Sequence, residues 1–158
     1  MAGLAGRKKG NEIMDKINVK LLRAGAHMPT YGTEGAAGAD LYACLEETLT
    51  ILPGQTVPVP TGVAMEIPRG CAGLVFARSS MGVKRDLAPA NKVGVIDSDY
   101  RGEIFVMLHN HGKEVRTVEP GERVAQIVIV PVFTPGFNQV EDLSDTVRGE
   151  GGFGSTGK

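Results

Sequence analysis

The sequence contains no tryptophan, only two cysteines and only three histidines among its 158 residues. Neither Cys44 nor Cys71 lies in a CxxC pair, and two cysteines allow at most one disulfide. A disulfide-stapled secreted fold and a zinc site are therefore both disfavoured. We expect both thiols to be reduced and buried as small apolar groups.

Long apolar runs are also absent. The longest, residues 104–108 and 127–133, have the length of a strand, and residues 1–11 lack the apolar stretch of a signal peptide or membrane helix. With 17 basic and 18 acidic residues the formal net charge is −1, so no global positive field points to nucleic acid. These absences favour a soluble, cytoplasmic protein whose partners include neither a membrane nor nucleic acid.

Amphipathic helical periodicity is nearly absent, apart from one short turn expected at residues 79–83. Glycine (22) and proline (9) are abundant, and Pro53-Gly54 and Pro120-Gly121 are typical of type II turns. Residues 57–59 form an edge strand at best, because Pro58 and Pro60 donate no ladder hydrogen bond. Alternation of apolar and polar side chains predicts strands at 17–21, 49–52, 62–67, 71–77, 91–97, 103–110, 115–118 and 122–133. The sequence thus predicts an all-β sandwich or barrel of the jelly-roll kind.

The chain divides into three segments of different composition. Residues 1–15 are expected to be a disordered extension, with a natural-looking start at Met14, and residues 16–142 a single β-barrel domain. Residues 143–158 are polar and glycine-rich, which predicts a flexible arm. Such an arm is either a disordered tail or, because it carries a lone phenylalanine and an arginine, a lid over a site.

The turn after residues 93–96 is the first candidate for chemistry. Asp97 closes this apolar run, where a carboxylate is costly without partners. The flanking segments 91–97 and 103–108 predict a β-hairpin around the acidic turn. A carboxylate held at a strand end beside a cavity is suited to be a general base for water. The alternative is an aspartate that only initiates the turn.

A second group of polar residues is suited to bind anionic oxygens. Arg78, Ser79 and Ser80 combine a cation with two hydroxyls, although Ser79 alone would be interpreted as a helix cap. Gln126 is the one polar side chain within residues 124–130, and its amide needs a partner from protein, water or ligand. Asp40 precedes an apolar strand and is equally explained as half of a structural ion pair.

The order of these signals resembles the trimeric dUTPase family, whose five motifs match residues 37–41, 78–82, 94–102, 121–126 and 148–156. The third and fifth motifs are the specific ones. The resemblance implies a distorted jelly-roll β-barrel of the β-clip type, assembled as a homotrimer with shared sites and arms that close neighbouring sites. It also implies hydrolysis of dUTP to dUMP and pyrophosphate, which limits uracil in DNA and supplies dUMP for thymidylate synthesis.

The resemblance assigns roles to individual residues. Asp97 matches the general base that activates water against the α-phosphorus, and Tyr100 matches the aromatic floor beneath the deoxyribose. Uracil recognition falls to Asn91, the main chain of Gly94, Val95, Ile96 and Asp97, and Phe105. The phosphates fall to Arg78, Ser79, Ser80, Gln126, Arg148, Ser155 and Thr156, with Phe153 stacking on the base. Mg²⁺ is expected to bind through the triphosphate and waters, one of them oriented by Asp99, with no direct protein ligand.

Two alternatives remain open at this point. A dCTP deaminase has a related fold and a motif similar to Arg78-Ser79-Ser80, and a non-catalytic module would keep only the nucleotide pocket. The turn at 99–102 and the glycine-rich arm favour the hydrolase. Ala77 and Met81 depart from the usual family residues, and the segment 84–90 has no assigned role.

Overall fold

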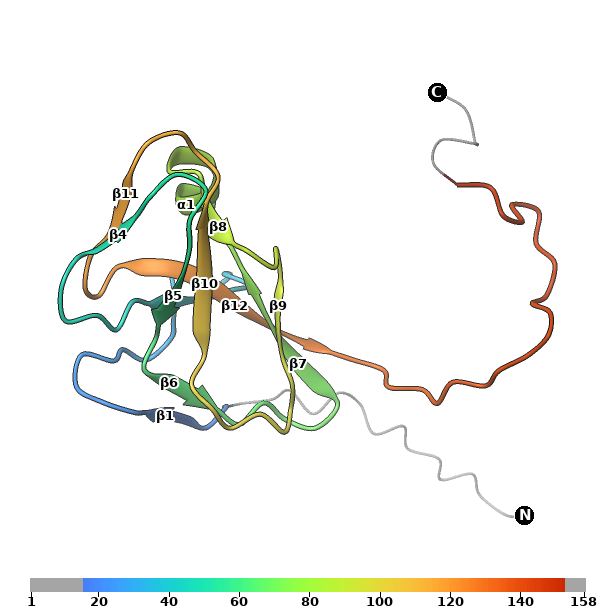
Figure 1. Ribbon diagram of the computed structural model, residues 1–158. Helices are drawn as coiled ribbons and strands as arrows, with labels where there is room; N and C mark the ends of the chain where they lie inside the picture. Colours follow the sequence, from blue (N-terminus) through green and yellow to red (C-terminus); the bar gives the residue numbers. More distant parts are fainter. Residues whose placement is uncertain (1–15, 153–158) are drawn as a thin grey trace, which may run out of the picture.

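The computed structural model of the chain describes residues 16–152, and short strands make up nearly all of its regular structure (Figure 1). The only helix among these residues is α1 (Ser79–Lys84). The strands are β1 (Val19–Leu21), β2 (Thr30–Tyr31), β3 (Ala39–Tyr42), β4 (Leu49–Ile51), β5 (Thr56–Pro60), β6 (Val63–Met65), β7 (Cys71–Phe76), β8 (Leu87–Pro89), β9 (Gly94–Ile96), β10 (Phe105–Asn110), β11 (Arg116–Val118) and β12 (Arg123–Pro131). The all-β prediction is confirmed.

The strands form four antiparallel sheets. The largest has the order β2-β3-β12-β7-β9, a second has the order β5-β10-β8, and the pairs β1-β6 and β11-β4 complete the body. Neighbours in a sheet come from distant parts of the sequence, as in β3 and β12. The large sheet therefore gathers polar residues from the first, second and fourth motifs onto adjacent strands.

Alternating side chains from these sheets meet in one hydrophobic core. In β10, Val106 and Leu108 point inward and are buried, whereas Phe105 and Met107 remain 49% and 41% exposed on the opposite face. This alternation is the pattern expected for a strand with one buried face. The single chain thus leaves an apolar sheet face open to its surroundings.

The predicted turns and edge strand are confirmed. Gly54 and Gly121 adopt φ angles of 73° and 75°, the left-handed conformation that a type II turn requires after proline. Strand β5, which contains Pro58, lies at an edge of its sheet and pairs only with β10. Both cysteines are free thiols as expected, although only Cys44 is buried and Cys71 is partly exposed.

The predicted hairpin around the acidic turn is wrong. Strand β9 pairs with β7, whereas β10 pairs with β5 and β8, so the two flanks of the turn belong to different sheets. The turn at 97–104 therefore crosses from one sheet to the other. The segment 84–90, which had no predicted role, contributes β8 to the same sheet as β10.

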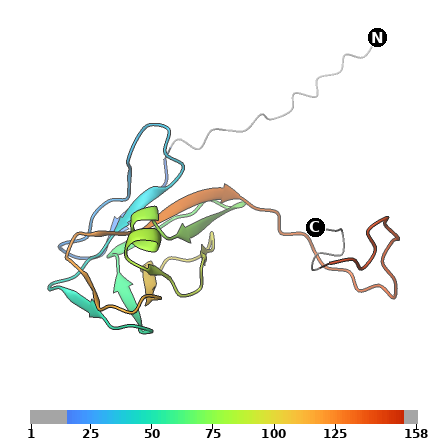
Figure 2. The ribbon, with the colours of Figure 1, turned by 90° about the horizontal axis from the view of Figure 1, so that it is seen from above.

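After Pro131 the chain leaves the body as an extended segment that leads into the predicted arm (Figures 1 and 2). Its apolar side chains contact little of their own chain, since Phe133 and Phe137 are 98% and 101% exposed. No helix within residues 16–152 is long and apolar enough to cross a membrane.

Candidate functional site

A cavity of about 240 Å³ lies at the crossing between the two sheets. It is lined by Val95, Ile96, Asp97, Tyr100, Glu103, Ile104 and Phe105. Five of these residues, all but Glu103 and Ile104, are predicted site residues. The structure therefore brings the proposed general base, the proposed sugar floor and the proposed base-recognition strand to one place.

The turn that carries Asp97 and Tyr100 is held by its own hydrogen bonds. The Tyr100 amide donates to the Asp97 carbonyl at 3.2 Å, and the Tyr100 hydroxyl donates to the Glu103 carbonyl at 2.9 Å. The Arg101 guanidinium donates to the carbonyls of Ser98 and Tyr100 at 2.8 and 2.9 Å. Asp97 and Tyr100 both remain exposed, so a ligand can reach them.

The main chain of β9 is open on one side. This strand is the last of the five-stranded sheet and pairs only with β7 within the described part of the chain. An edge strand presents a row of unpaired N–H and C=O groups. Gly94 begins this strand, and the Asn91 side chain lies beside it, with Nδ2 3.5 Å from the position a Gly94 Cβ would occupy. The strand can thus offer donors and acceptors to a planar base without using side chains.

A second cluster of polar residues lies on the other part of the large sheet. The buried carboxylate of Asp40 in β3 accepts a hydrogen bond from Arg78 Nε at 2.7 Å and another from Arg123 Nη1 at 3.2 Å. Arg78 Nη1 also donates to Ser80 Oγ at 3.2 Å. The Nη2 group of Arg78 has none of these partners, so the guanidinium is oriented in advance with donors to spare for an anion.

Gln126 and Ser79 complete the predicted phosphate group. Gln126 Nε2 donates to the Ala77 carbonyl at 3.0 Å, the protein partner that a part-buried amide requires. A side chain at Gly38 would collide with Gln126 Oε1, whose distance to the built Cβ is 2.5 Å. Ser79 is exposed in the first turn of α1, where Arg78 is the N-cap residue and no side chain caps the helix. The helix-cap interpretation of Ser79 is therefore wrong.

The cavity and the phosphate cluster are far apart in a single chain. Ile96, which precedes Asp97, pairs with Gly73 near the start of β7, whereas Arg78 follows the other end of this strand. The five positions from 73 to 78 span roughly 17 Å at about 3.3 Å per residue. Asp97 and Arg78 of one chain therefore lie near opposite ends of β7.

The arm contributes one predicted residue to the described structure. Arg148 Nε donates to the Gly151 carbonyl at 2.7 Å in an exposed turn. Phe153, Ser155 and Thr156 lie outside the described residues.

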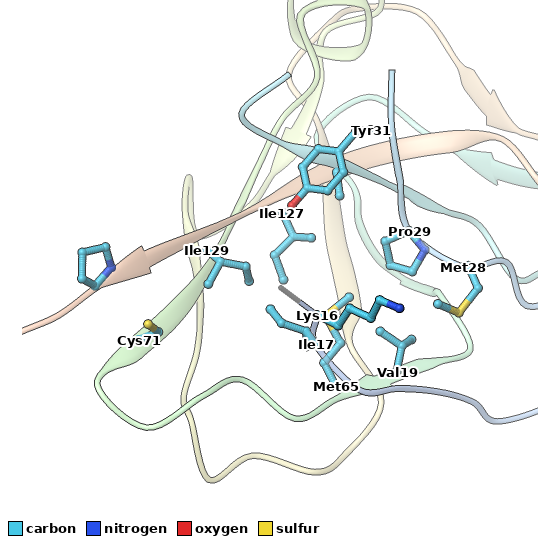
Figure 3. Close-up of a pocket in the computed structure, with 12 residues that line it drawn as sticks. Lys16, Ile17, Val19, Met28, Pro29, Tyr31, Met65, Cys71, Ile127 and Ile129 are labelled. Carbon is cyan, nitrogen blue, oxygen red and sulfur yellow. The ribbon is translucent and has the colours of Figure 1, made fainter. Parts of the chain in front are cut away.

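A larger cavity of about 580 Å³ contains none of the predicted site residues (Figure 3). Its wall is mainly apolar and includes Ile17, Ile127 and Ile129, and the side chain of Lys16 extends among these residues in Figure 3. A site for a triphosphate needs cations and hydrogen-bond donors. The smaller cavity, and not this one, carries the candidate chemistry.

Comparison with known proteins decides the family. The family model described as dUTPase matches residues 24–157. The chain belongs to the dUTPase family. The deoxyuridine 5'-triphosphate nucleotidohydrolase of Azoarcus sp. strain BH72 is 49% identical over 148 residues, which cover 92% of this chain and 99% of that relative.

Solved dUTPase structures share the fold. The dUTPase of Staphylococcus bacteriophage 80alpha, solved with dUPNHPP, superposes with a TM-score of 0.80 at 32% identity, covering 91% of this chain and 99% of that one. A mutant dUTPase from phage phi11 of S. aureus superposes with a TM-score of 0.73 at 28% identity, covering 81% and 98%. That structure is described as revealing the coordination of a structural Mg(II) ion. The distorted jelly-roll of the dUTPase family, expected from the resemblance, is confirmed.

Two charged residues of this dUTPase-family site were not predicted from the sequence. Arg123 shares the Asp40 carboxylate with Arg78, and Glu103 lies in the wall of the smaller cavity. The sequence alone leaves the role of Asp40 open, and the structure shows its carboxylate paired with both Arg78 and Arg123. Arg123 lies within the fourth motif, three positions before Gln126, but an arginine at the start of a strand gives no signal of its partner.

Proposed function

We propose that the protein hydrolyses dUTP to dUMP and pyrophosphate, with Asp97 as the general base. The observation that carries this proposal is the cavity that Asp97 and Tyr100 line together with residues of β9, an edge strand of its sheet. Asp97 would take a proton from water as its oxygen attacks the α-phosphorus. The bond from that phosphorus to the oxygen bridging to the β-phosphorus breaks, and pyrophosphate leaves.

The open edge of β9 supports uracil as the base. The edge of uracil presents an acceptor, a donor and an acceptor, which main-chain groups from Gly94 to Asp97 can complement, with Asn91 and the main chain of Phe105 alongside. Cytosine reverses part of this pattern and would leave buried groups unpaired. Tyr100 would pack under the sugar, where close contact leaves no room for a 2'-hydroxyl.

The polar cluster around Asp40 and the arm would together bind the triphosphate. Arg78, with its orientation set by Asp40, would pair with phosphate oxygens, and Ser79, Ser80 and Gln126 would add neutral donors. From the arm, Arg148, Ser155 and Thr156 would engage the terminal phosphates and Phe153 would stack on the uracil. Base stacking on an aromatic ring contributes about 1–3 kcal/mol.

A homotrimer with shared sites explains why the two halves of the machinery are separated in one chain. Because roughly 17 Å of strand separates the Asp97 end of β9 from Arg78, the phosphate-binding residues beside Asp97 would come from a neighbouring chain. The open apolar face of β10 and the exposed side chains of Phe133 and Phe137, ahead of the arm, both offer surface for such a neighbour.

Magnesium fits this site through the substrate. Within residues 16–152 no group of three or more His, Cys, Asp and Glu side chains converges as a metal site. Mg²⁺ commonly keeps several waters and binds through substrate phosphates, so it needs no protein cage. When bound it would neutralise phosphate charge, and the exposed carboxylate of Asp99 would orient one of its waters.

The activity is tested by incubating the purified protein with each common deoxynucleoside triphosphate and Mg²⁺. We expect pyrophosphate release from dUTP alone. Ammonia released from dCTP would instead identify a deaminase, and nucleotide binding without any turnover would identify a non-catalytic module.

Chain mixing tests whether each site is shared. Asp97→Asn and Arg78→Ala chains would be co-expressed with different tags, purified as mixed oligomers and assayed at a low dUTP concentration at which neither variant alone turns over. If each site takes these residues from two chains, random mixing restores about one quarter of the sites, because each required residue is intact in half of the chains. Absence of recovered turnover in verified mixed oligomers would contradict the shared site.

A further inference from the structure

Glu103 is held more tightly than a residue that merely lines a cavity. Its side chain is only 13% exposed, and its carboxylate accepts hydrogen bonds from Arg23 Nη2 at 2.5 Å and Nη1 at 2.9 Å. The Gly62 amide adds a third donor at 2.7 Å. Three donors from two distant loops therefore converge on one carboxylate beside Asp97 and Tyr100.

Glu103 is also the residue that holds the Tyr100 ring. The Tyr100 hydroxyl donates to the Glu103 carbonyl at 2.9 Å, so that the ring folds back over its own turn. Gly102 permits this fold, because a Cβ at that position would collide with the Tyr100 hydroxyl oxygen. The side chain of Glu103 anchors the turn, and its main chain anchors the ring.

The loops that hold Glu103 are themselves fixed. Gly62 has a φ angle of 67°, and a Cβ there would lie 2.6 Å from Ala26 Cβ, so the two loops pack too closely for a side chain. The Leu22 amide donates to the Gly62 carbonyl at 2.8 Å, which ties the loop that carries Arg23 to the loop that carries Gly62. The carboxylate thus binds to a rigid pair of loops.

Other contacts already set the register of β10. The Ile104 amide donates to the Val63 carbonyl at 2.9 Å, and Thr61 Oγ1 donates to the Ile104 carbonyl at 2.6 Å. The strand therefore does not need the Glu103 side chain to find its place. What that side chain adds is the position of the preceding turn, which carries Tyr100, relative to the body.

We propose that Glu103, held by Arg23, is a positioning residue. It fixes how closely the Tyr100 ring approaches the sugar and thereby the discrimination of 2'-deoxyribose from ribose. This inference rests on the proposed role of Tyr100 as the floor beneath the sugar. A hydroxyl is excluded only if the ring cannot retreat, and a fixed turn provides that resistance. The Arg23 cation also offsets the negative charge that Glu103 would otherwise add to the cavity of Asp97.

Arg23→Met tests the proposal with little risk to folding, because the Arg23 side chain is 42% exposed. The kcat/KM for dUTP and the inhibition constant of UTP against dUTP turnover would be measured for both proteins. We expect the preference for the deoxynucleotide to fall about tenfold, mainly through tighter UTP binding. Arg23→Lys should restore part of the preference, since one charged donor remains.

A double-mutant cycle shows whether the effect passes through the ring. Tyr100→Phe removes the hydroxyl that bonds the Glu103 carbonyl, and it should lower the sugar preference as Arg23→Met does. Because both changes release the same turn, the double variant should lose little more than either single variant. Independent, additive losses would overturn the proposed route.

The control is Arg116→Met, which removes another partly exposed arginine that pairs with Glu114 and Asp86. It should lower the melting temperature without changing the sugar preference. If Arg23→Met does the same, Glu103 is only structural and the proposal fails. A wild-type protein that releases no pyrophosphate from dUTP would instead refute the proposed function.

Discussion

The polar cluster around Asp40 and the smaller cavity beside Asp97 use different kinds of groups. In the cluster, charged side chains from β3, β12 and the end of β7 are paired across one sheet around the buried Asp40 carboxylate. In the cavity, the groups proposed to recognise the base are main-chain atoms on an open strand edge, and a crossing turn carries the proposed catalytic carboxylate. Changes in the cluster should therefore weaken binding, whereas changes in the cavity should affect chemistry and selectivity.

The largest expected effect is on Asp97. Asp97→Asn keeps the size of the side chain but removes the base, so turnover should fall on the order of 10³-fold while a non-cleavable dUTP analogue still binds. Single-turnover kinetics and calorimetry with the analogue separate the two steps. Asp99→Asn, two residues away on the same turn, is the matched control and should lose far less. Turnover that survives Asp97→Asn would show that another group is the base.

Removal of residues 148–158 tests whether the arm acts as a lid that turnover requires. Truncation after Val147 should leave a folded oligomer, because residues 140–147 ahead of the cut are all exposed in their own chain, yet lower turnover on the order of 10²-fold. Light scattering checks assembly and pyrophosphate release checks activity. Full activity in the truncated protein would remove the proposed lid.

Asp40→Asn should have a smaller effect, mainly on substrate binding and less on the chemical step. The amide keeps the shape but loses the charge that pairs with Arg78 and Arg123, so KM for dUTP should rise about tenfold with a smaller change in kcat. The same change should lower the free energy of unfolding by about 1–3 kcal/mol. A fall in kcat at constant KM would contradict the division between the two regions.

The smallest expected effect is the pH dependence of stability at Glu103. Hydrogen bonds from Arg23, followed by the bond from the Gly62 amide, hold the pKa of Glu103 below its ordinary value of 4.5 in the folded protein. A carboxyl with a lowered folded-state pKa stabilises the protein above its unfolded pKa. That stabilisation is lost as the pH falls below 4.5 and through the lower folded-state value.

Urea titrations at fixed protein concentration, at pH 7 and at steps below pH 4.5, check this dependence. The wild-type protein should lose more unfolding free energy over that range than Glu103→Gln, which has no carboxyl to protonate. Parallel pH profiles for the two proteins would show that Glu103 is not a source of acid sensitivity.

Local features of the fold could be predicted from the sequence because their causes are local. The alternation in residues 17–21 and 103–110 and the Pro-Gly turns follow from side-chain pattern and backbone preference alone. The need of Gln126 for a partner was also predictable, although the identity of the Ala77 carbonyl was not. The family motifs supplied the grouping of Asp97, Tyr100 and the β9 main chain.

Pairing over long separations could not be predicted. Arg23 and Glu103 are 80 positions apart, and Asp40 and Arg123 are 83 apart, so a single sequence contains no sign that they meet. The hairpin prediction failed for a related reason. Two strands joined by a short turn usually pair, but here β9 pairs with β7 through the large sheet instead.

The open edge of β9, proposed to bind the base, is also a site at which another molecule could add a strand. An unpaired strand edge can template the addition of a strand from another molecule, and proteins normally cover such edges or block them with charge. An edge that must admit a base cannot be covered permanently. The chain limits the exposed ladder to three residues, Gly94–Ile96, between the charged Lys92 and Asp97. Protection against aggregation and the proposed catalysis thus depend on the same carboxylate, and replacing Asp97 by a neutral residue removes part of both.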